Sequence, residues 1–194
     1  MKVVIIKYNA GNIRSVDFAL RRLGYQAEIT DDPATIRSAD RVIFPGVGEA
    51  SSTMSYLKER KMDQLLGSLT QPVLGICLGQ QLMCSHSEEK NTPCIGIFDL
   101  PVLLFPAGIE KVPHMGWNCL REVKGGLIDG TLEGAYVYFV HSYYVQCGEA
   151  TAATADYILP FSAALQKDNF FATQFHPEKS GDAGAQILSN FLKL

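Results

Sequence analysis

The segment that most constrains the fold is a short apolar run that ends in a cysteine flanked by two glycines. The run 72–74 is followed by Gly75-Ile76-Cys77-Leu78-Gly79, and a helical pattern comes next. This order predicts a strand, a sharp turn and a helix, which form a nucleophile elbow with sulfur in place of the serine oxygen. The glycines fit such a strained turn because side chains there would clash across it. Cys77 would lie at a helix N-terminus, where the helix dipole favours a thiolate and hence covalent catalysis.

Strand and helix signals alternate through the first half of the chain. The expected strands are 2–7, 26–30, 41–44 and 73–76, and the expected helices are 12–23 and 50–69. Strands separated by helices predict an α/β fold with a doubly wound, mostly parallel central sheet flanked by helices. Ligands bind at the carboxyl ends of the strands in such sheets, where Cys77 and the loop Pro45-Gly46-Val47-Gly48 would meet.

The C-terminal half has a different pattern. Residues 135–146, 151–155, 162–166 and 170–175 indicate strands, and Lys167-Asp168-Asn169 indicates a hairpin turn between the last two. These segments are expected to add antiparallel strands to the sheet. Ser180 is expected to cap a last helix that runs through Phe191. Because no repeat or linker-like segment interrupts the pattern, residues 1–194 are interpreted as a single domain.

Composition narrows the classes of function. A net charge of -3 gives no basic surface for nucleic acid or an anionic membrane, and no apolar run is long enough to cross a bilayer. The five cysteines form no Cys-x-x-Cys pair, which argues against a disulfide framework and structural zinc. Residues 1–7 are interpreted as a buried strand rather than a signal peptide. We therefore expect a cytoplasmic protein that binds neither nucleic acid nor membrane and needs no metal.

His176 is the best candidate for the base that a thiol nucleophile needs. It lies in Gln174-Phe175-His176-Pro177-Glu178, at the end of an expected strand. Residues i and i+2 of an extended segment project to the same side, so Glu178 is expected to hydrogen-bond the imidazole and fix its tautomer. The predicted catalytic set is therefore Cys77 as nucleophile, His176 as base and Glu178 as the orienting carboxylate.

An oxyanion hole needs N–H groups that are already oriented toward the developing charge. In an elbow, one donor comes from the residue after the nucleophile, which is Leu78. The glycine-rich loop after the strand 41–44 is expected to supply the second donor from Val47 or Gly48, because glycine allows unusual backbone angles.

Three segments resemble, in the right order, the signatures of class I (triad) glutamine amidotransferases. They are Pro45-Gly46-Val47-Gly48, Gly75-Ile76-Cys77-Leu78-Gly79-Gln80-Gln81 and Gln174-Phe175-His176-Pro177-Glu178. Two further segments, Pro113-His114-Met115-Gly116-Trp117-Asn118 and Tyr138-Phe139-Val140-His141-Ser142-Tyr143, resemble the glutaminase subunits of imidazole glycerol phosphate synthases, enzymes of histidine biosynthesis.

The resemblance implies hydrolysis of L-glutamine to glutamate and ammonia through a thioester on Cys77. The ammonia would pass to a cyclase subunit with a (β/α)8 barrel, which forms a heterodimer with the glutaminase and makes imidazole glycerol phosphate and an aminoimidazole carboxamide ribotide. No metal or organic cofactor is implied. The residues implied to hold the amino-acid end of the substrate are Gln81, Ser142 and Tyr143, and those implied to contact the cyclase or line the ammonia exit are Asn12, Trp117, Asn118 and Lys179.

The chain departs from the family in one loop. Where relatives usually have Asp-Tyr-Gly-x-Gly-Asn, this chain has Lys7-Tyr8-Asn9-Ala10-Gly11-Asn12. The departure concerns the expected partner surface rather than the triad. Three alternatives stay open at this stage: a glutaminase that serves a surface-sugar pathway, a stand-alone cysteine hydrolase, and a catalytically inactive binding subunit.

Overall fold

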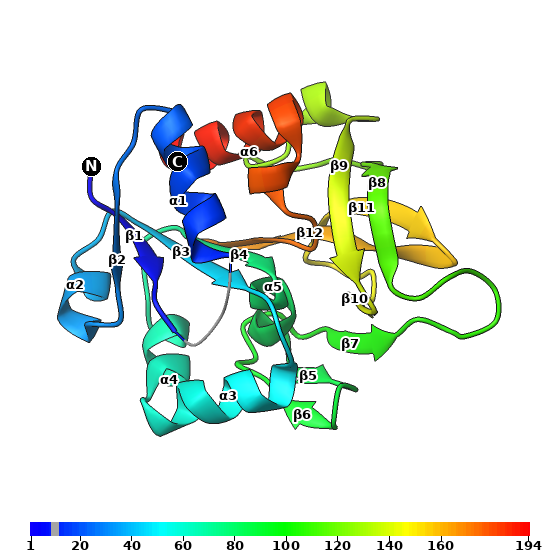
Figure 1. Ribbon diagram of the computed structural model, residues 1–194, viewed down its shortest axis with the longest axis horizontal. Coiled ribbons are helices and arrows are strands. Elements are labelled where there is room, and N and C mark those ends of the chain that lie inside the picture. The colour runs from blue at the N-terminus through cyan, green and yellow to red at the C-terminus, as the bar shows by residue number, and fades with distance from the viewer. Residues whose placement is uncertain (9–11) are drawn as a thin grey trace.

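The structure, a computed structural model, describes residues 1–8 and 12–194. These residues include a seven-stranded central sheet with the strand order β11-β12-β13-β4-β3-β1-β2 (Figure 1). The parallel strands are β2 (Ala27–Thr30), β1 (Val3–Ile6), β3 (Arg41–Gly46), β4 (Val73–Cys77) and β13 (Phe170–Thr173). Antiparallel pairing then adds β12 (Leu159–Lys167) and β11 (Thr151–Tyr157). The predicted fold class is confirmed.

Helices cover both faces of this sheet, so its strands are apolar on both sides. Ile5 and Ile43 face a core shared with α1 (Ile13–Arg22) and α6 (Gly181–Lys193). Their neighbours Val4 and Val42 face a second core, shared with the helices of the other layer. These are α2 (Pro33–Arg37), α3 (Ala50–Glu59), α4 (Met62–Gly67) and α5 (Leu78–Met83). Figure 1 shows α1 and α6 above the sheet and α3, α4 and α5 below it.

Two smaller sheets lie at the side of the molecule where the antiparallel strands are. One contains β10 (Tyr143–Val145), β7 (Pro101–Leu104), β5 (His86–Ser87) and β6 (Thr92–Pro93). The other is a two-stranded ribbon of β8 (His114–Cys119) and β9 (Tyr136–His141), called the β8–β9 ribbon below. Short 3₁₀ turns, η1 (Gly130–Leu132) and η2 (Pro177–Lys179), complete the described elements.

Several expected boundaries were wrong for local reasons. The helix expected over 50–69 is two helices, because Lys61 has a left-handed φ of 55° and separates α3 from α4. The strand expected over 135–146 breaks at Ser142, after which the chain leaves β9 and pairs with β7 as β10. Ser180 does precede α6, but its hydroxyl donates to the carbonyl of His176 at 2.7 Å and accepts from the N–H of Tyr138 at 2.9 Å. Its expected role as a side-chain cap was therefore wrong.

The strands β5 to β8 and the helix α2 were not expected. In the described part of the chain, no helix combines the length and apolar character needed to cross a membrane.

Candidate active site

Cys77 ends β4 in a strained backbone conformation. Its φ of 55° and ψ of -110° turn the chain directly into α5. The expected reason for the flanking glycines is confirmed: a Cβ on Gly75 would lie 2.5 Å from Sδ of Met83, and one on Gly79 would lie 2.1 Å from the carbonyl oxygen of Phe44. Strand β3 and helix α5 therefore pack so closely at the elbow that only glycine fits between them.

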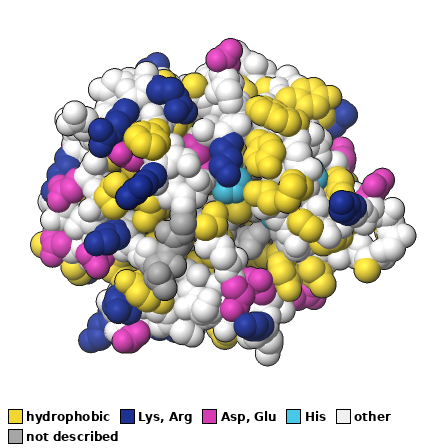
Figure 2. Space-filling view, in the orientation of Figure 1, with side chains coloured by type: hydrophobic (Ala, Val, Ile, Leu, Met, Phe, Trp, Pro, Cys, Tyr) yellow, Lys and Arg dark blue, Asp and Glu magenta, His cyan; other side chains and the backbone are white. Residues whose placement is uncertain are grey.

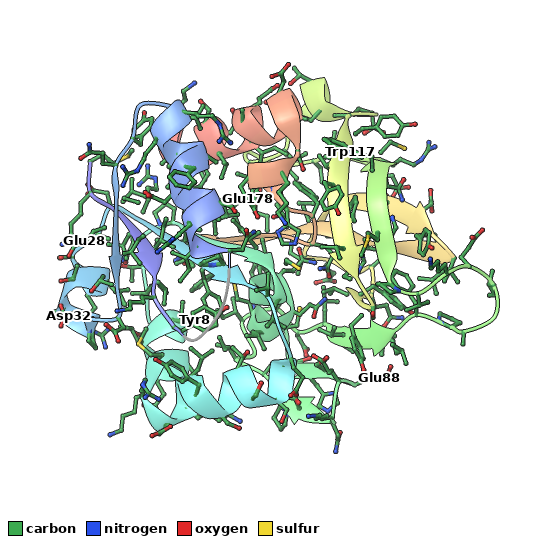
Figure 3. The ribbon with its side chains drawn as sticks, in the orientation of Figure 1. Tyr8, Glu28, Asp32, Glu88, Trp117 and Glu178 are labelled. Carbon is green, nitrogen blue, oxygen red and sulfur yellow. The ribbon has the colours of Figure 1, made fainter. Side chains whose placement is uncertain are left out.

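His176 reaches Cys77 because their strands are neighbours. β13 pairs in parallel with β4, with Thr173 opposite Ile76, so both chains end at the same edge. The ring Nδ1 lies 2.8 Å from Oε1 of Glu178, and both side chains are buried. The expected contact therefore exists, but the expected extended geometry was wrong, because Glu178 lies in the 3₁₀ turn η2. Figure 3 labels Glu178 at the centre of the molecule, beside the start of α1.

Asn12 contacts the same carboxylate oxygen of Glu178 that His176 does. Its side-chain amide donates to Oε1 of Glu178 and lies 3.4 Å from Nδ1 of His176. Asn12 therefore contacts the predicted triad directly, and its implied place at the partner surface or the ammonia exit stays a prediction. Asn9, Ala10 and Gly11, which share the divergent loop, lie outside the described residues.

The electrostatics of the site favour a charged imidazole. Burial by itself lowers the pKa of His176, but the nearby Cys77 sulfur and the Glu178 carboxylate, which lies 2.8 Å from Nδ1, outweigh it and raise the pKa to about 10. Its Nε2 is buried and has no hydrogen-bond partner in the described structure, and His176 and Cys77 line the same cavity. The arrangement suits a ring that exchanges one proton with the thiol and a leaving group.

A cavity of about 290 Å³ opens over the thiol and collects the predicted side chains. Val47, Gly48 and Leu78 line it next to Cys77, and Gln81, Ser142 and Tyr143 line its other parts. Gly46 pairs with Cys77 across β3 and β4, so the loop that follows β3 enters the site directly. Gly48 has a φ of 115°, a conformation that favours glycine. The structure thus brings the expected oxyanion and substrate residues together around one sulfur atom.

Gln81 is fixed by hydrogen bonds inside the protein. Its Nε2 donates to the carbonyl of Tyr143 and to Oε1 of Gln174, both at 2.9 Å. Gln174 in turn points Nε2 at Sγ of Cys77, 3.8 Å away. Because both hydrogens of the Gln81 amide are used, only its Oε1 is left to accept a hydrogen bond from a ligand.

The family model described as "Glutamine amidotransferase class-I" matches residues 4–194. The chain belongs to the class I glutamine amidotransferase family. It is 62% identical to the imidazole glycerol phosphate synthase subunit HisH of Bacteroides fragilis (strain YCH46) and 60% identical to that of Bacteroides thetaiotaomicron. The subunit of the same name from Yersinia pestis is 45% identical. Each comparison covers 100% of both chains. The resemblance drawn from the motifs is confirmed.

Solved structures agree with this class I amidotransferase in fold. A crystal structure of a glutamine amidotransferase has a TM-score of 0.75 at 19% identity, and covers 98% of this chain and 97% of its own. Another glutamine amidotransferase, from Thermotoga maritima, has a TM-score of 0.65 at 16% identity, over 99% of this chain and 82% of its own.

The remaining predicted residues of the amidotransferase lie on or beside the β8–β9 ribbon. Trp117 is 54% exposed and packs edge-on against Tyr138, and the ammonium of Lys179 lies 5.9 Å from the Tyr138 ring centre. Asn118 is turned inward, because its amide donates to the carbonyl of Asp156 at 2.8 Å. Figure 2 shows apolar side chains gathered on the right of the molecule, where Figure 1 draws the ribbon, and Figure 3 labels Trp117 there.

Sequence reasoning missed three contributors to the amidotransferase site. Glu89 lines the cavity, with its Oε2 accepting the N–H of Ala50 at 2.7 Å. His141 lines it as well, and Gln174 contacts the sulfur. No local signal identifies Glu89, which lies in a polar run like any surface loop. Among the described residues, no group of three or more histidine, cysteine or acidic side chains is arranged to hold a metal ion.

Proposed function

We propose that this chain is the glutaminase subunit of an imidazole glycerol phosphate synthase, hydrolysing L-glutamine to glutamate and ammonia for histidine biosynthesis. One observation carries the proposal. A cysteine on a strained elbow faces a buried histidine–glutamate pair across a cavity, in a chain that is 62% identical over its full length to a subunit with that name.

The proposed first half-reaction forms a thioester. The Cys77 thiolate attacks the carboxamide carbon of glutamine, and the carbonyl oxygen becomes an oxyanion. The N–H of Leu78 and an N–H from the Val47–Gly48 peptides would stabilise that charge, since donors oriented in advance are worth most in a buried site. The carbon–nitrogen bond then breaks as the His176 imidazolium gives its proton to the departing ammonia. The raised pKa of His176 supports this assignment, because the ring must carry that proton at neutral pH.

The proposed second half-reaction releases glutamate. Neutral His176 takes a proton from a water molecule, which attacks the thioester carbon, and the carbon–sulfur bond breaks to restore the thiolate. Glu178 stays ionised throughout and stabilises the imidazolium through the contact of 2.8 Å at Nδ1.

Side chains around the cavity would recognise the amino-acid end of glutamine. Oε1 of Gln81, and groups of Ser142 and Tyr143, are the proposed partners from the predicted set. We add Glu89, because one of its oxygens accepts the Ala50 N–H and the other remains for the α-ammonium group.

The proposed partner is a cyclase subunit with a (β/α)8 barrel, which would receive the ammonia. The relatives are named as subunits of a synthase, and that name supports a two-protein enzyme. Trp117 and Lys179 on the exposed face beside Tyr138 are the proposed contacts, because an exposed tryptophan on an apolar face suits an interface. With all five cysteines free, the reducing cytoplasm is the proposed location.

Glutamine turnover of the purified chain, alone and with the cyclase from the same genome, tests this function. Ammonia release is expected to rise roughly tenfold or more when the cyclase and its nucleotide ligand are added. Equal turnover with and without the cyclase would favour a stand-alone hydrolase instead. Failure of a glutamine-analogue electrophile to label Cys77 in the complex would favour an inactive binding subunit. Activation only by a partner from a surface-sugar pathway would assign the protein to that pathway instead of histidine biosynthesis.

A further inference from the structure

The β8–β9 ribbon carries two buried histidines that the proposed mechanism does not use, and one of them, His141, lines the cavity. His114 is on β8 and His141 faces it from β9, and their relative exposures are 4% and 6%. Nδ1 of His114 lies 3.1 Å from Nε2 of His141, and Nδ1 of His141 lies 2.7 Å from the carbonyl oxygen of Tyr143. A buried polar pair of this kind needs an explanation in the structure.

The hydrogen-bond partners fix the tautomer of both rings. A carbonyl oxygen only accepts, so Nδ1 of His141 carries the hydrogen and its Nε2 must accept from Nδ1–H of His114. Nε2 of His114 is then an acceptor, and the amide nitrogen of Asn118 lies 3.5 Å away. Donation therefore runs in one direction, from Asn118 through both rings to Tyr143. Burial supports the neutral state, since it lowers the pKa of His114 to about 4 and that of His141 to about 3.

The carbonyl of Tyr143 connects this series of hydrogen bonds to the reaction site. It accepts from Nδ1 of His141 and also from Nε2 of Gln81, which is linked through Gln174 to Sγ of Cys77. The same backbone, at the break between β9 and β10, forms the wall of the cavity that Ser142 and Tyr143 line. Backbone pairing with β7 holds one side of this wall, where the N–H of Phe105 donates to the carbonyl of Ser142 at 3.1 Å. The carbonyl of Tyr143 is held instead by two side chains, those of His141 and Gln81.

We propose that His114 is a positioning residue for glutamine: acting through His141, it holds the Tyr143 carbonyl and thereby sets the wall of the cavity against which the substrate binds. The inference rests on the proposed hydrolysis of glutamine at Cys77. It gives a role to a side chain that touches neither the cavity nor the sulfur.

The surroundings of His114 allow its hydrogen bond to be separated from its packing. Its ring stacks between Tyr157 and Phe139, with centroid distances of 4.0 and 5.0 Å. His114→Phe keeps an aromatic ring in this stack and removes the donor. His114→Asn loses the stack but keeps an amide donor near the place of Nδ1.

The test measures kcat and KM for glutamine in the complex with the cyclase, together with thermal unfolding. We expect His114→Phe to raise KM roughly tenfold, the loss of one buried hydrogen bond, with kcat changed much less. His114→Asn is expected to unfold at a lower temperature yet keep KM within about threefold of the parent. His86→Phe, the same change at a histidine outside the site, is expected to leave KM unaltered. A parental KM in His114→Phe, or losses in both His114 variants that simply follow stability, would overturn the inference.

Labelling of Cys77 separates this inference from the proposed function. A glutamine-analogue diazoketone should label His114→Phe more slowly than the parent, whereas iodoacetamide, which does not use the substrate wall, should label both at the same rate. Equal diazoketone rates would overturn the positioning role. If the parent reacts with iodoacetamide but not with the diazoketone, the proposed function itself fails.

Discussion

Three side chains and one backbone turn concentrate the chemistry at Cys77. Cys77 has a φ of 55°, a backbone conformation that residues other than glycine adopt only at an energetic cost. The neighbouring His176 is buried against the carboxylate of Glu178. Backbone strain is concentrated at functional sites in many proteins, where it holds a reactive group in place. Changes to these single residues are expected to alter the protonation and the orientation of the His176 ring.

Glu178→Gln keeps the size of the side chain but removes the charge that orients His176. We expect kcat for glutamine to fall roughly 10²- to 10⁴-fold, because the imidazolium loses its stabilising partner. Turnover in the complex with the cyclase is the measurement. Glu59→Gln, at an exposed carboxylate paired with Arg60, is the matched control and should retain parental activity. Similar activity in the two variants would contradict the role of Glu178.

Cys77→Ala should change the titration of His176. Burial lowers the pKa of His176, and Cys77 and Glu178 together raise it to about 10, so removing the sulfur is expected to lower the pKa. Because the folded pKa lies above the ordinary value of 6.5, the charged ring stabilises the fold fully below about pH 6.5. That stability is lost as the pH rises through about 10 in the parent, and at lower pH in the variant. NMR titration of the ring measures this, and an identical titration in both proteins would refute it.

The elements bring these residues together through the order of the central sheet. β4 carries the thiol, and its two neighbours β3 and β13 deliver the glycine loop and the histidine. Close packing of α5 on β3 at Gly79 fixes the position of the elbow relative to β3. The cysteine, the histidine and the glycine loop therefore all follow strands that are paired side by side.

Gly79→Ala tests this packing. The new methyl group would lie 2.1 Å from a backbone oxygen of Phe44, which cannot rotate away, so we expect a loss of about 3 kcal/mol in the free energy of unfolding. Gly130→Ala is the control, because a Cβ there meets no described atom within 4 Å. Urea denaturation of both variants gives the comparison. A stable Gly79→Ala protein would mean that the elbow can move as a unit.

The outer face of the β8–β9 ribbon is the proposed binding surface for the cyclase. Trp117→Ala is expected to weaken binding of the cyclase roughly 30-fold, since buried tryptophans dominate interfaces. Ile29→Ala, at a 39% exposed position on the edge strand β2, is the control for loss of exposed apolar area. Calorimetric titration with the cyclase measures both, and equal affinities would remove Trp117 from the proposed interface.

For the molecule as a whole, features that depend on contiguous motifs could be predicted from the sequence, whereas pairings between distant segments could not. The elbow glycines, the sheet and the His176–Glu178 contact each depend on a few adjacent residues with a strong local reason. β5 and β6 are pairs of residues with no periodicity, and only contacts with distant strands define them. Glu89 and Gln174 reach the site through tertiary packing, which is why no spacing in the chain pointed to them. The break at Ser142 was missed because apolar residues continue on both sides of it.

The place of β13 in the sheet also bears on how the protein is made. Among the described strands β13 comes latest in the sequence, yet it lies inside the sheet, between β4 and β12, and not at an edge. A nascent chain that ends before residue 170 therefore has the elbow and its cysteine, but an open gap where β13 belongs and no histidine beside the thiol. Non-local pairing of this kind is formed late, after the chain has paid the entropy of closing a long loop. We therefore expect a product truncated before residue 170 to keep the nucleophile but to lack the base that activates it.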